Sequence, residues 1–252
     1  MTEPPAPAAR RTRRRATHSM ESVVSEAVAL LDEAGESALT FRALAARLGG
    51  GVASIYWYVS NKEELLDKAT DHVLRGVVEK ARDLRHADDP VDDIRAIAQT
   101  LFDAVVDRPW LGTYLMRDTD AQTSGMQLYE LIGQQILRLG LTPWESFGAV
   151  SAVTGFVIGT ATDLGQSPPP ELLAGETDRT EFIHDAADRW RALDPAEYPF
   201  IHYIVDEFAE HDDTEQFRAG LDLLLAGLRL QAEKSRDRAA RATPEDRRPA
   251  RE

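Results

Sequence analysis

The sequence predicts an all-α fold in which a small N-terminal three-helix head precedes a larger helical body. Apolar residues recur at three- and four-residue spacing along much of the 252-residue chain, which is the period of an amphipathic helix. No stretch of useful length alternates apolar and polar residues as a strand would. Glycine and proline fall between the periodic segments, where helices begin and end.

The first two helices are short and closely spaced. Apolar residues at helical spacing predict a helix over 20–34, and Gly35 ends it in the usual C-terminal position. Thr40 is a suitable N-cap for the second helix, because its hydroxyl can accept a hydrogen bond from the first turn. That helix is predicted from the apolar face of Phe41 and the residues at three- and four-residue spacing after it.

A glycine turn leads into the third helix of the head. Gly49–Gly51 end the second helix. The apolar stripe that follows consists of Val52, Ile55 and Val59. The S-x-x-E pattern from Ser60 to Glu63 predicts a capping box. It would open a longer helix near Asn61 that runs past Arg82.

The rest of the chain is also predicted to be helical, with prolines and glycines at the helix boundaries. The expected helices span 91–107, 122–139, 143–165, 180–192, 196–210 and 214–233, with a loop over 165–180. The chain is therefore predicted to have four parts. They are a disordered basic arm (1–17), the head (18–64), the body (65–233) and a disordered tail (234–252).

Composition excludes several kinds of site. The chain has no cysteine, so disulfides, thiolate zinc sites and cysteine nucleophiles are excluded. No run approaches the roughly 18 apolar residues of a membrane span. The N-terminus also lacks the apolar stretch of a signal peptide. We therefore expect a cytoplasmic protein with no membrane partner.

The net charge of −14 is unevenly distributed. Residues 1–75 hold 10 of the 29 basic and 10 of the 43 acidic side chains, so the later residues carry the whole acidic excess. Five of those first ten cations are arginines at positions 10, 11, 13, 14 and 15. A basic arm and a neutral head joined to an acidic body suit a protein that presents one end to a polyanion. The alternative is that the arm only aids solubility.

A short helix, a glycine turn and a second short helix form the helix-turn-helix arrangement, whose second helix enters the DNA major groove. The side of that helix opposite the core carries Ala53, Ser54, Trp57 and Tyr58, with Tyr56 at the flank. Such a surface would read bases through the Ala53 methyl group, Ser54 and the aromatic rings. The tyrosine hydroxyls would contact phosphates.

Three polar side chains at neighbouring helix starts are further candidates for DNA contact. Lys62 lies in the first turn of the connecting helix, where free N–H groups and the helix dipole favour a phosphate. Thr40 and Arg42 can reach the DNA backbone or a base edge. The plainer alternatives are that Tyr56 packs partly in the core and that Arg42 and Lys62 are solvated surface charges.

The stretch from Leu39 to Asp71 resembles the DNA-binding domain of TetR-family transcriptional repressors. The matching elements are L-T-x-R-x-L-A, then L-G, then Y-W-Y-V-x-N-K-x-x-L-L-D. The resemblance implies an all-α dimer with a small head and a ligand-binding and dimerisation body. By position it also implies DNA contacts from Thr40, Arg42, Ala53, Ser54, Tyr56, Trp57, Tyr58 and Lys62.

Two body helices are predicted to form a dimer interface. One face of 143–165 carries a stripe of small residues that permits close helix approach. The stripe consists of Gly148, Ala152, Gly155 and Gly159. The segment 214–233 is apolar nearly all round and must be buried on most sides. Its part Gly220–Leu228 is similar to the C-terminal helix of the tetracycline-repressor-like body, which implies a four-helix interface between two copies. The alternative is a helix pair inside a monomer.

Aromatic and apolar residues with a few polar groups, typical of a small-molecule pocket, are candidates to line a cavity in the body. They are Phe102, Trp110, Tyr114, Met126, Phe147, Phe156, Thr160, Asp163, Trp190, Phe200 and Tyr203. The tetracycline-binding members hold a drug–magnesium chelate with histidines and an acidic residue. The matching histidine positions here are Val78, Trp110 and Gly155, and only Asp163 keeps an acidic character. We therefore expect no metal and no cofactor, and an apolar or aromatic ligand with Trp110 as a stacking wall.

Together the motifs predict a ligand-responsive transcriptional regulator and not an enzyme. The chain has no nucleophile-elbow motif, P-loop or dinucleotide glycine fingerprint. His184 and Asp188 have metal-ligand spacing but no third ligand nearby in sequence. We expect a homodimeric repressor that leaves a palindromic operator in double-stranded DNA when a small apolar or aromatic effector binds. The alternative is a small-molecule-binding or protein-interaction module whose head no longer reads DNA. An enzyme is a remote third option that rests only on the predicted cavity.

Overall fold

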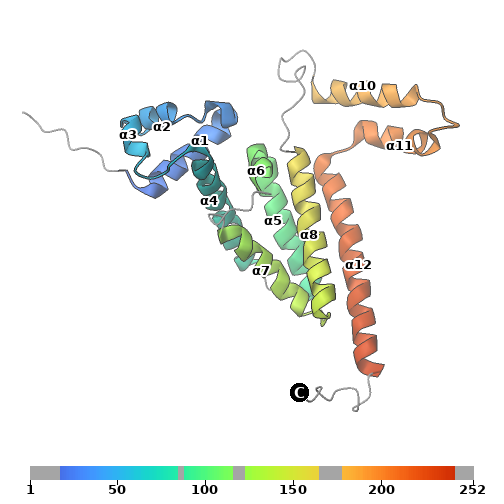
Figure 1. The fold of residues 1–252 in the computed structure, drawn as a ribbon. Helices are drawn as coiled ribbons and strands as arrows, with labels where there is room; N and C mark the ends of the chain where they lie inside the picture. Colours follow the sequence, from blue (N-terminus) through green and yellow to red (C-terminus); the bar gives the residue numbers. More distant parts are fainter. Residues whose placement is uncertain (1–17, 85–87, 116–122, 165–177, 242–252) are drawn as a thin grey trace, which may run out of the picture. The chain divides into compact units, whose positions relative to one another are not determined.

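The computed structural model describes residues 18–84, 88–115, 123–164 and 178–241. Within those ranges the chain forms eleven α-helices and no strand, which confirms the predicted all-α fold (Figure 1). The predicted arm (1–17) and most of the predicted loop after α8 lie outside the described residues. The chain divides into two compact units, 1–69 and 70–252. In the described ranges, no helix combines the length and hydropathy that crossing a membrane requires.

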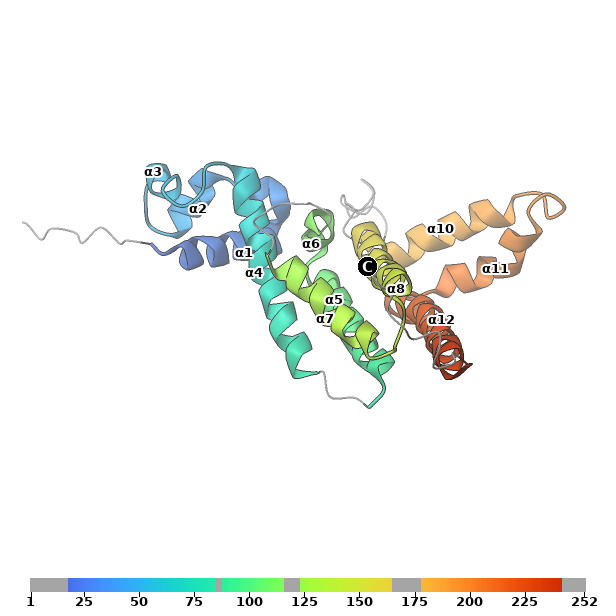
Figure 2. The ribbon, with the colours of Figure 1, turned by 60° about the horizontal axis from the view of Figure 1, so that its bottom comes forward.

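The helices of the first unit begin and end where local sequence signals place them (Figure 2). They are α1 (Met20–Ala38), α2 (Phe41–Arg47), α3 (Val52–Ile55) and the first turns of α4 (Lys62–Asp83). Gly35 has a φ of +69° and interrupts α1, in the left-handed region that glycine adopts without strain. Thr40 accepts a hydrogen bond from the Ala43 amide at 3.1 Å and so caps α2, as predicted.

The head has a small core of its own. Leu39, Leu44 and Ile55 are fully buried in it. The prediction was wrong for Val52, which is 36% exposed because it stands at the first position of the short helix α3. Leu65 and Ala69 are also fully buried. The head therefore extends through Ala69 and not only to the predicted boundary at 64.

The predicted cap of α4 is shifted by one residue. Asn61 accepts a hydrogen bond from the Glu64 amide at 2.8 Å, and Glu64 accepts one from the Ser60 amide at 2.7 Å. The predicted pair of Ser60 and Glu63 is therefore wrong, although the helix begins where that pair placed it. The asparagine takes the capping role because its side-chain oxygen is as good an acceptor as a serine hydroxyl.

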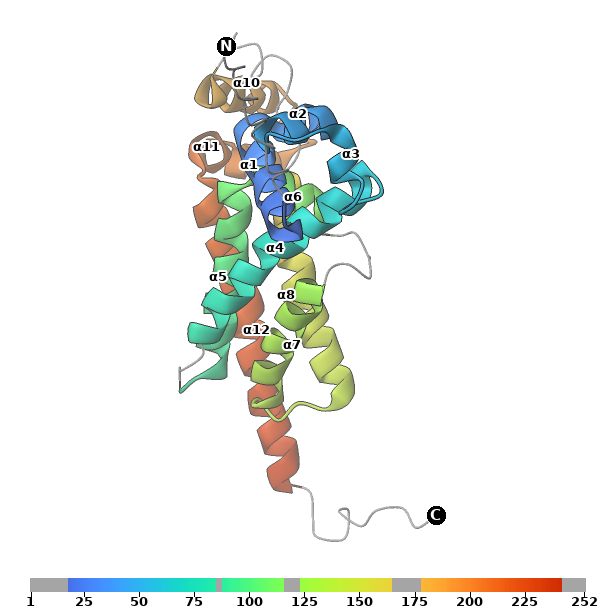
Figure 3. The same ribbon diagram turned by 90° about the vertical axis from the view of Figure 1, so that its left-hand side faces the viewer.

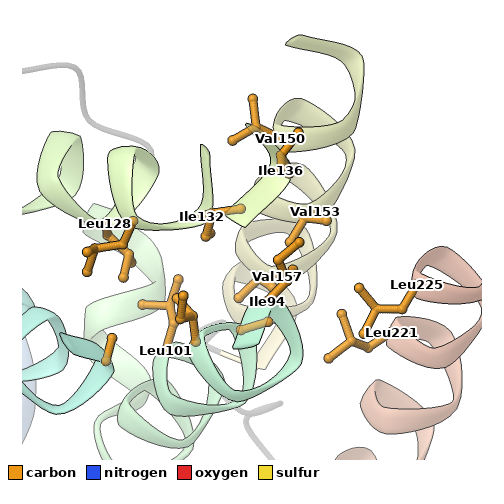
Figure 4. Close-up of a cluster of buried hydrophobic side chains, with 14 of the residues drawn as sticks. Ile94, Leu101, Leu128, Ile132, Ile136, Val150, Val153, Val157, Leu221 and Leu225 are labelled. Carbon is orange, nitrogen blue, oxygen red and sulfur yellow. The ribbon is translucent and has the colours of Figure 1, made fainter. Parts of the chain in front are cut away.

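The second unit is built around a helical bundle, in which α8 and α12 run side by side (Figures 1 and 3). Its members are the rest of α4 with α5 (Pro90–Asp107), α7 (Thr123–Leu137), α8 (Pro143–Leu164) and α12 (Asp213–Arg241). Figure 4 shows side chains from α5, α7, α8 and α12 meeting in the core, among them Ile94, Ile132, Val153 and Leu221. This apolar burial is the main stabilising contribution to the unit.

Three phenylalanine rings form a stack inside the bundle. Phe217 lies between Phe102, at a ring-centroid distance of 3.8 Å, and Phe156, at 5.5 Å. Phe102 and Phe217 are 0% and 1% exposed. Because these rings fill the space between α5, α8 and α12, Phe102 is part of the packed core.

Two helices between α8 and α12 form a hairpin with separate apolar contacts. α10 (Arg179–Arg191) and α11 (Pro199–Glu210) pack on each other (Figure 1). Ala187, Val205 and Ala209 are buried between them, with Trp190 packed alongside. The hairpin is thus a small second layer with its own cluster, apart from the core of the bundle.

The C-terminal helix is longer than its sequence pattern indicated. α12 continues to Arg241, so the predicted disordered tail from 234 is wrong for its first residues, and 242–252 lie outside the described residues. The Ser235 hydroxyl donates to the Gly140 carbonyl at 2.7 Å, and Arg238 bonds Glu145 at 2.6 Å. The short helix α6 (Pro109–Tyr114) was not predicted, because six residues are too few to show a period.

Candidate nucleic-acid interface

Helix α3 and the turn after it, residues 52–59, present one buried side and one exposed aromatic side. Ile55 and Val59 are 0% and 2% exposed, whereas Trp57 is 86% and Tyr56 is 59% exposed. Ala53 is exposed, and the half-buried Ser54 donates its hydroxyl to the Gly51 carbonyl at 2.6 Å. This segment therefore offers an indole and a methyl group to a partner without any rearrangement of the fold.

Tyr56 is both packed within the head and exposed to solvent, which are the two placements that the sequence left open. Its ring meets that of Phe41 edge-on, with centroids 4.9 Å apart. More than half of the residue remains exposed. Since the ring is held by Phe41, the rest of Tyr56 is presented to a partner in a fixed orientation.

Tyr58 does not lie on the exposed side with Trp57. It is half-buried, and its hydroxyl donates a hydrogen bond to the backbone carbonyl of His18. A β-carbon on Gly50 would lie 2.9 Å from Nε2 of His18, so the histidine ring packs closely over the glycine turn. The hydroxyl that was predicted to bind a phosphate is already bonded within the head.

Lys62 is also engaged within the head. Its ammonium group donates to the Glu36 carbonyl at 2.8 Å and lies 3.2 Å from the Glu36 carboxylate. The first turn of α4 still follows a capped N-terminus, but this lysine ties α4 to the end of α1. A phosphate would have to compete with Glu36 for it.

Arg47 forms a charged cluster that no local sequence pattern indicates. Its guanidinium bonds both carboxylate oxygens of Glu33, at 2.7 and 2.9 Å, and it pairs with Glu26. These hydrogen bonds lower the pKa of Glu33 and raise that of Arg47. The cluster joins α1 to α2, and the guanidinium of Arg47 is therefore already paired within the head.

Arg42 differs from the other cations of the head. It is exposed at the start of α2, and none of the described residues forms a recorded ion pair or hydrogen bond with its guanidinium. Of the predicted DNA-contact residues, Arg42, Ala53, Tyr56 and Trp57 are therefore available on the surface. Thr40, Ser54, Tyr58 and Lys62 each have a partner inside the head.

The predicted ligand residues of the body differ widely in their exposure to solvent. The exposed members are Met126, Phe147, Asp163, Phe200 and Tyr203. Phe102 and Tyr114 are buried, and Trp110, Phe156, Thr160 and Trp190 are half-buried. Their role in an effector site stays a prediction, because an amphipathic pattern does not distinguish a cavity wall from packed core or exposed surface.

Trp110 and its neighbours form a smaller group within that set. Trp110 lies 6.4 Å from Tyr114, ring centroid to ring centroid, and packs against the buried pair Val105 and Leu111. Further along α8, Thr162 donates to the Gly112 carbonyl at 3.4 Å. This group at the junction of α6 and α8 retains the mixed aromatic and polar character expected of an effector site.

An exposed apolar surface runs along α8 and α12. Trp144 is 80%, Phe147 58%, Leu223 78% and Leu230 51% exposed. A groove of about 470 Å³ lies between the two helices here. The small-residue stripe lies on the exposed side of α8, with open space beside Gly148, Gly155 and Gly159. A helix pair buried inside a monomer does not account for these positions.

The comparisons with known proteins agree with this architecture. The model for bacterial regulatory proteins of the tetR family matches residues 23–69, and that for the tetracyclin repressor-like C-terminal domain matches 85–232. The chain is 29% identical over 240 residues to the HTH-type transcriptional repressor DrrR1 of Streptomyces coeruleorubidus, covering 89% of this chain and 82% of that protein.

Solved structures of bacterial regulators also resemble this chain. The transcriptional regulator SCO7222, a TetR from Streptomyces coelicolor, is 38% identical with a TM-score of 0.70, over 85% of this chain and 99% of that one. ActR of the same organism, in complex with actinorhodin, shares the fold with a TM-score of 0.69 at 23% identity, over 84% and 96% of the two chains. The head, the body and these matches together show that the chain belongs to the TetR family of bacterial transcriptional regulators.

Proposed function

We propose that this protein is a homodimeric, ligand-responsive repressor that binds a palindromic operator and leaves it when a small aromatic or apolar molecule binds. The observation that carries the proposal is the surface of the head, where Trp57 and Arg42 are exposed. The exposed indole, in the turn directly after α3, buries little surface in the fold. It is suited to contact with base edges and thymine methyl groups.

The apolar surface of α8 and α12 supports the dimer. A second copy would cover Trp144, Leu223 and the small-residue stripe, which are otherwise in contact with water. A two-fold axis would present two recognition helices to half-sites about 34–36 Å apart. Leu223→Glu is expected to yield a folded monomer in analytical ultracentrifugation. A wild-type chain that sediments as a monomer at micromolar concentration would contradict the dimer.

An aromatic effector is supported by the surroundings of Trp110 and Tyr114 and by the structure of ActR with actinorhodin. We propose that such a molecule acts by binding, without catalysis, and that the protein works in the cytoplasm, where it has access to chromosomal DNA. A shift of about 1–3 kcal/mol in DNA-binding free energy is typical of coupling between two sites.

The test is selection of bound duplexes from a genomic library with the purified full-length protein, repeated with a panel of aromatic small molecules. We expect a palindromic sequence, bound with steep salt dependence and released by at least one compound. Trp57→Ala should abolish selection, whereas Leu137→Ala, which removes an apolar side chain 70% exposed on α7, should leave it intact. Failure to bind any duplex under every ligand condition would favour an interaction module instead.

A further inference from the structure

The described part of the head has few cations that are available to a polyanion. Residues 18–69 contain four basic and eight acidic side chains. Arg47 bonds both carboxylate oxygens of Glu33, and Lys68 lies 3.6 Å from Glu64. Since phosphate neutralisation supplies much of the affinity for DNA, the pairing of cations within the head reduces the affinity that this surface can reach.

Lys62 is held by two different groups of the same residue. Its ammonium nitrogen lies 2.8 Å from the backbone carbonyl oxygen of Glu36 and 3.2 Å from the carboxylate oxygen Oε1. An ammonium group has three donors and no acceptor. The carbonyl takes one donor and the carboxylate can take a second, which leaves a third N–H for another partner. The carbonyl therefore fixes where the ammonium lies, and the carboxylate neutralises its charge.

Lys62 also lies close enough to the exposed indole of Trp57 to reach the same duplex. Five positions separate the two residues, and α4 begins at Lys62. An extended chain of five residues spans at most about 18 Å, which is about half of a duplex turn. A phosphate beside the base pairs that Trp57 contacts is therefore within the range of the lysine side chain.

Both members of this ion pair are open to an approaching ligand. The Lys62 side chain is 40% exposed and the Glu36 side chain 51%. A phosphate oxygen can therefore reach the ammonium without any change in the fold of the head. In the free protein the Glu36 carboxylate opposes that approach in two ways, because it occupies one donor and repels the negative charge of the phosphate.

We infer that Glu36 limits the affinity of the head for DNA by competing with a phosphate for Lys62. The inference rests on the proposed function of the head. In the complex the ammonium keeps its bond to the Glu36 carbonyl and gives its remaining donors to a phosphate oxygen, while the carboxylate returns to solvent. The free energy that the ion pair contributed to the free protein is then lost from the net affinity for DNA.

The other paired cations of the described head are less suited to such competition. Arg47 joins α1 to α2 through two carboxylates, those of Glu26 and Glu33. Lys68 pairs with Glu64 one turn earlier on α4, and Glu64 also accepts a hydrogen bond at the cap of that helix. Release of either cation to a phosphate would therefore disturb contacts that hold the head together.

A purely structural role for the pair of Glu36 and Lys62 predicts the opposite result. If the contact served only to hold α4 against the end of α1, its loss would loosen the head and weaken DNA binding. If Glu36 competes with a phosphate, removing its charge strengthens binding. The sign of the change in affinity therefore separates the two roles.

The first experiment replaces Glu36 by glutamine in the full-length protein and measures affinity, over a range of salt concentrations, for the duplex recovered by the genomic selection. Glu36→Gln keeps the backbone carbonyl and the length of the side chain. An exposed ion pair contributes little to stability, so the variant is expected to fold. We expect affinity to rise about two- to fivefold for each bound head, the range for an exposed ion pair. The slope of log affinity against log salt should steepen by up to about 0.9 per head, the value of one phosphate contact.

The matched control is Glu63→Gln, which removes the same charge from the residue next to Lys62. The Glu63 carboxylate is exposed and makes no ion pair or hydrogen bond with any described residue. Because one exposed charge is largely screened by salt, this change should raise affinity less than about twofold and leave the salt slope as it is. Weaker or unchanged binding by Glu36→Gln, or an equal gain in Glu63→Gln, would overturn the inference.

A double-mutant cycle shows whether the gain in affinity depends on Lys62. In the Lys62→Gln background, Glu36→Gln should change affinity no more than Glu63→Gln does, because no ammonium is left for a phosphate to bind. A full gain in that background would show that Glu36 repels DNA directly, and would overturn the competition. A wild-type protein that binds no duplex would overturn the proposed function and the inference with it. A wild-type protein that binds, with no gain in Glu36→Gln, would overturn the inference alone.

Discussion

The ring of Phe156 lies directly over Gly220, where a β-carbon would come within 2.5 Å of the ring's Cζ atom. Phe156 cannot turn away freely, because it stacks on Phe217 in the core of the bundle. Gly220→Ala is therefore expected to destabilise the protein by about 1–3 kcal/mol through overpacking, despite the better helix propensity of alanine. Denaturant unfolding measures the change. Gly133→Ala, at a helical glycine with open space around it, should instead be neutral or gain up to about 1 kcal/mol.

Glu145 makes the contact between the start of α8 and the end of α12 dependent on pH. Its pKa is lowered from the usual 4.5 to about 2, first by the hydrogen bond from the Thr142 amide and then by Arg238. A carboxylate with a lowered folded-state pKa stabilises the fold above its unfolded pKa, and this contribution is lost as the pH falls from about 4.5 toward 2. The melting temperature of Glu145→Gln should therefore fall less than that of the wild type between pH 5 and pH 2.5. Parallel melting curves would contradict this assignment.

Arg138 neutralises a carboxylate inside the bundle. Asp93 is 1% exposed and lies 2.9 Å from the guanidinium of Arg138, which also bonds Gln135 at 2.7 Å. Arg138→Ala should cost up to about 3–5 kcal/mol, because it removes the guanidinium that lies beside a buried carboxylate. The double variant with Asp93→Asn should recover part of that loss in urea unfolding. Equal stabilities of the single and double variants would show that the buried charge is not the cause.

Thr40 is expected to act as a helix cap, whatever contact it also makes with DNA. Its hydroxyl accepts from the Ala43 amide, so Thr40→Ala should cost about 0.5–2 kcal/mol of stability. Thr40→Ser keeps the acceptor and should restore most of this stability. If Thr40→Ala weakened operator binding without lowering the melting temperature, the residue would be a DNA contact and not a structural cap.

The features that were predictable from the sequence are those decided by neighbouring residues. Gly35 breaks the regular geometry of α1 and Gly140 follows the end of α7, each with a φ angle of +69°. Thr142 and Glu145 cap α8 reciprocally, through hydrogen bonds of 3.0 and 3.3 Å. Each of these features depends on residues within a few positions of one another, so a short sequence motif indicates it. The order of the longer helices and the burial of Ile55 and Val59 followed from the same kind of information.

The features that were missed depend on residues far apart in the chain. Tyr58 bonds a residue 40 positions away, Lys62 one 26 positions away, and Arg238 one 93 positions away. No local pattern indicates such partners, so two residues predicted to contact phosphates proved to be engaged within the head. The same limit applies to the effector site. The sequence alone does not distinguish exposed Tyr203 from buried Phe102, because both are aromatic residues in predicted helices.

The hairpin of α10 and α11 has a consequence for the dynamics of the body. Its own cluster of Ala187, Val205 and Ala209, with Trp190 and Phe208 packed against it, buries far less apolar surface than the core of the bundle. A segment with so small a cluster can open locally while the rest of the protein stays folded. In native-state hydrogen exchange its amides should lose protection at low denaturant, well before those of α5 and α8. The body thus combines a bundle with a large apolar core and a hairpin with a small one, so a partner molecule that contacts α10 or α11 would order them at little cost to the bundle.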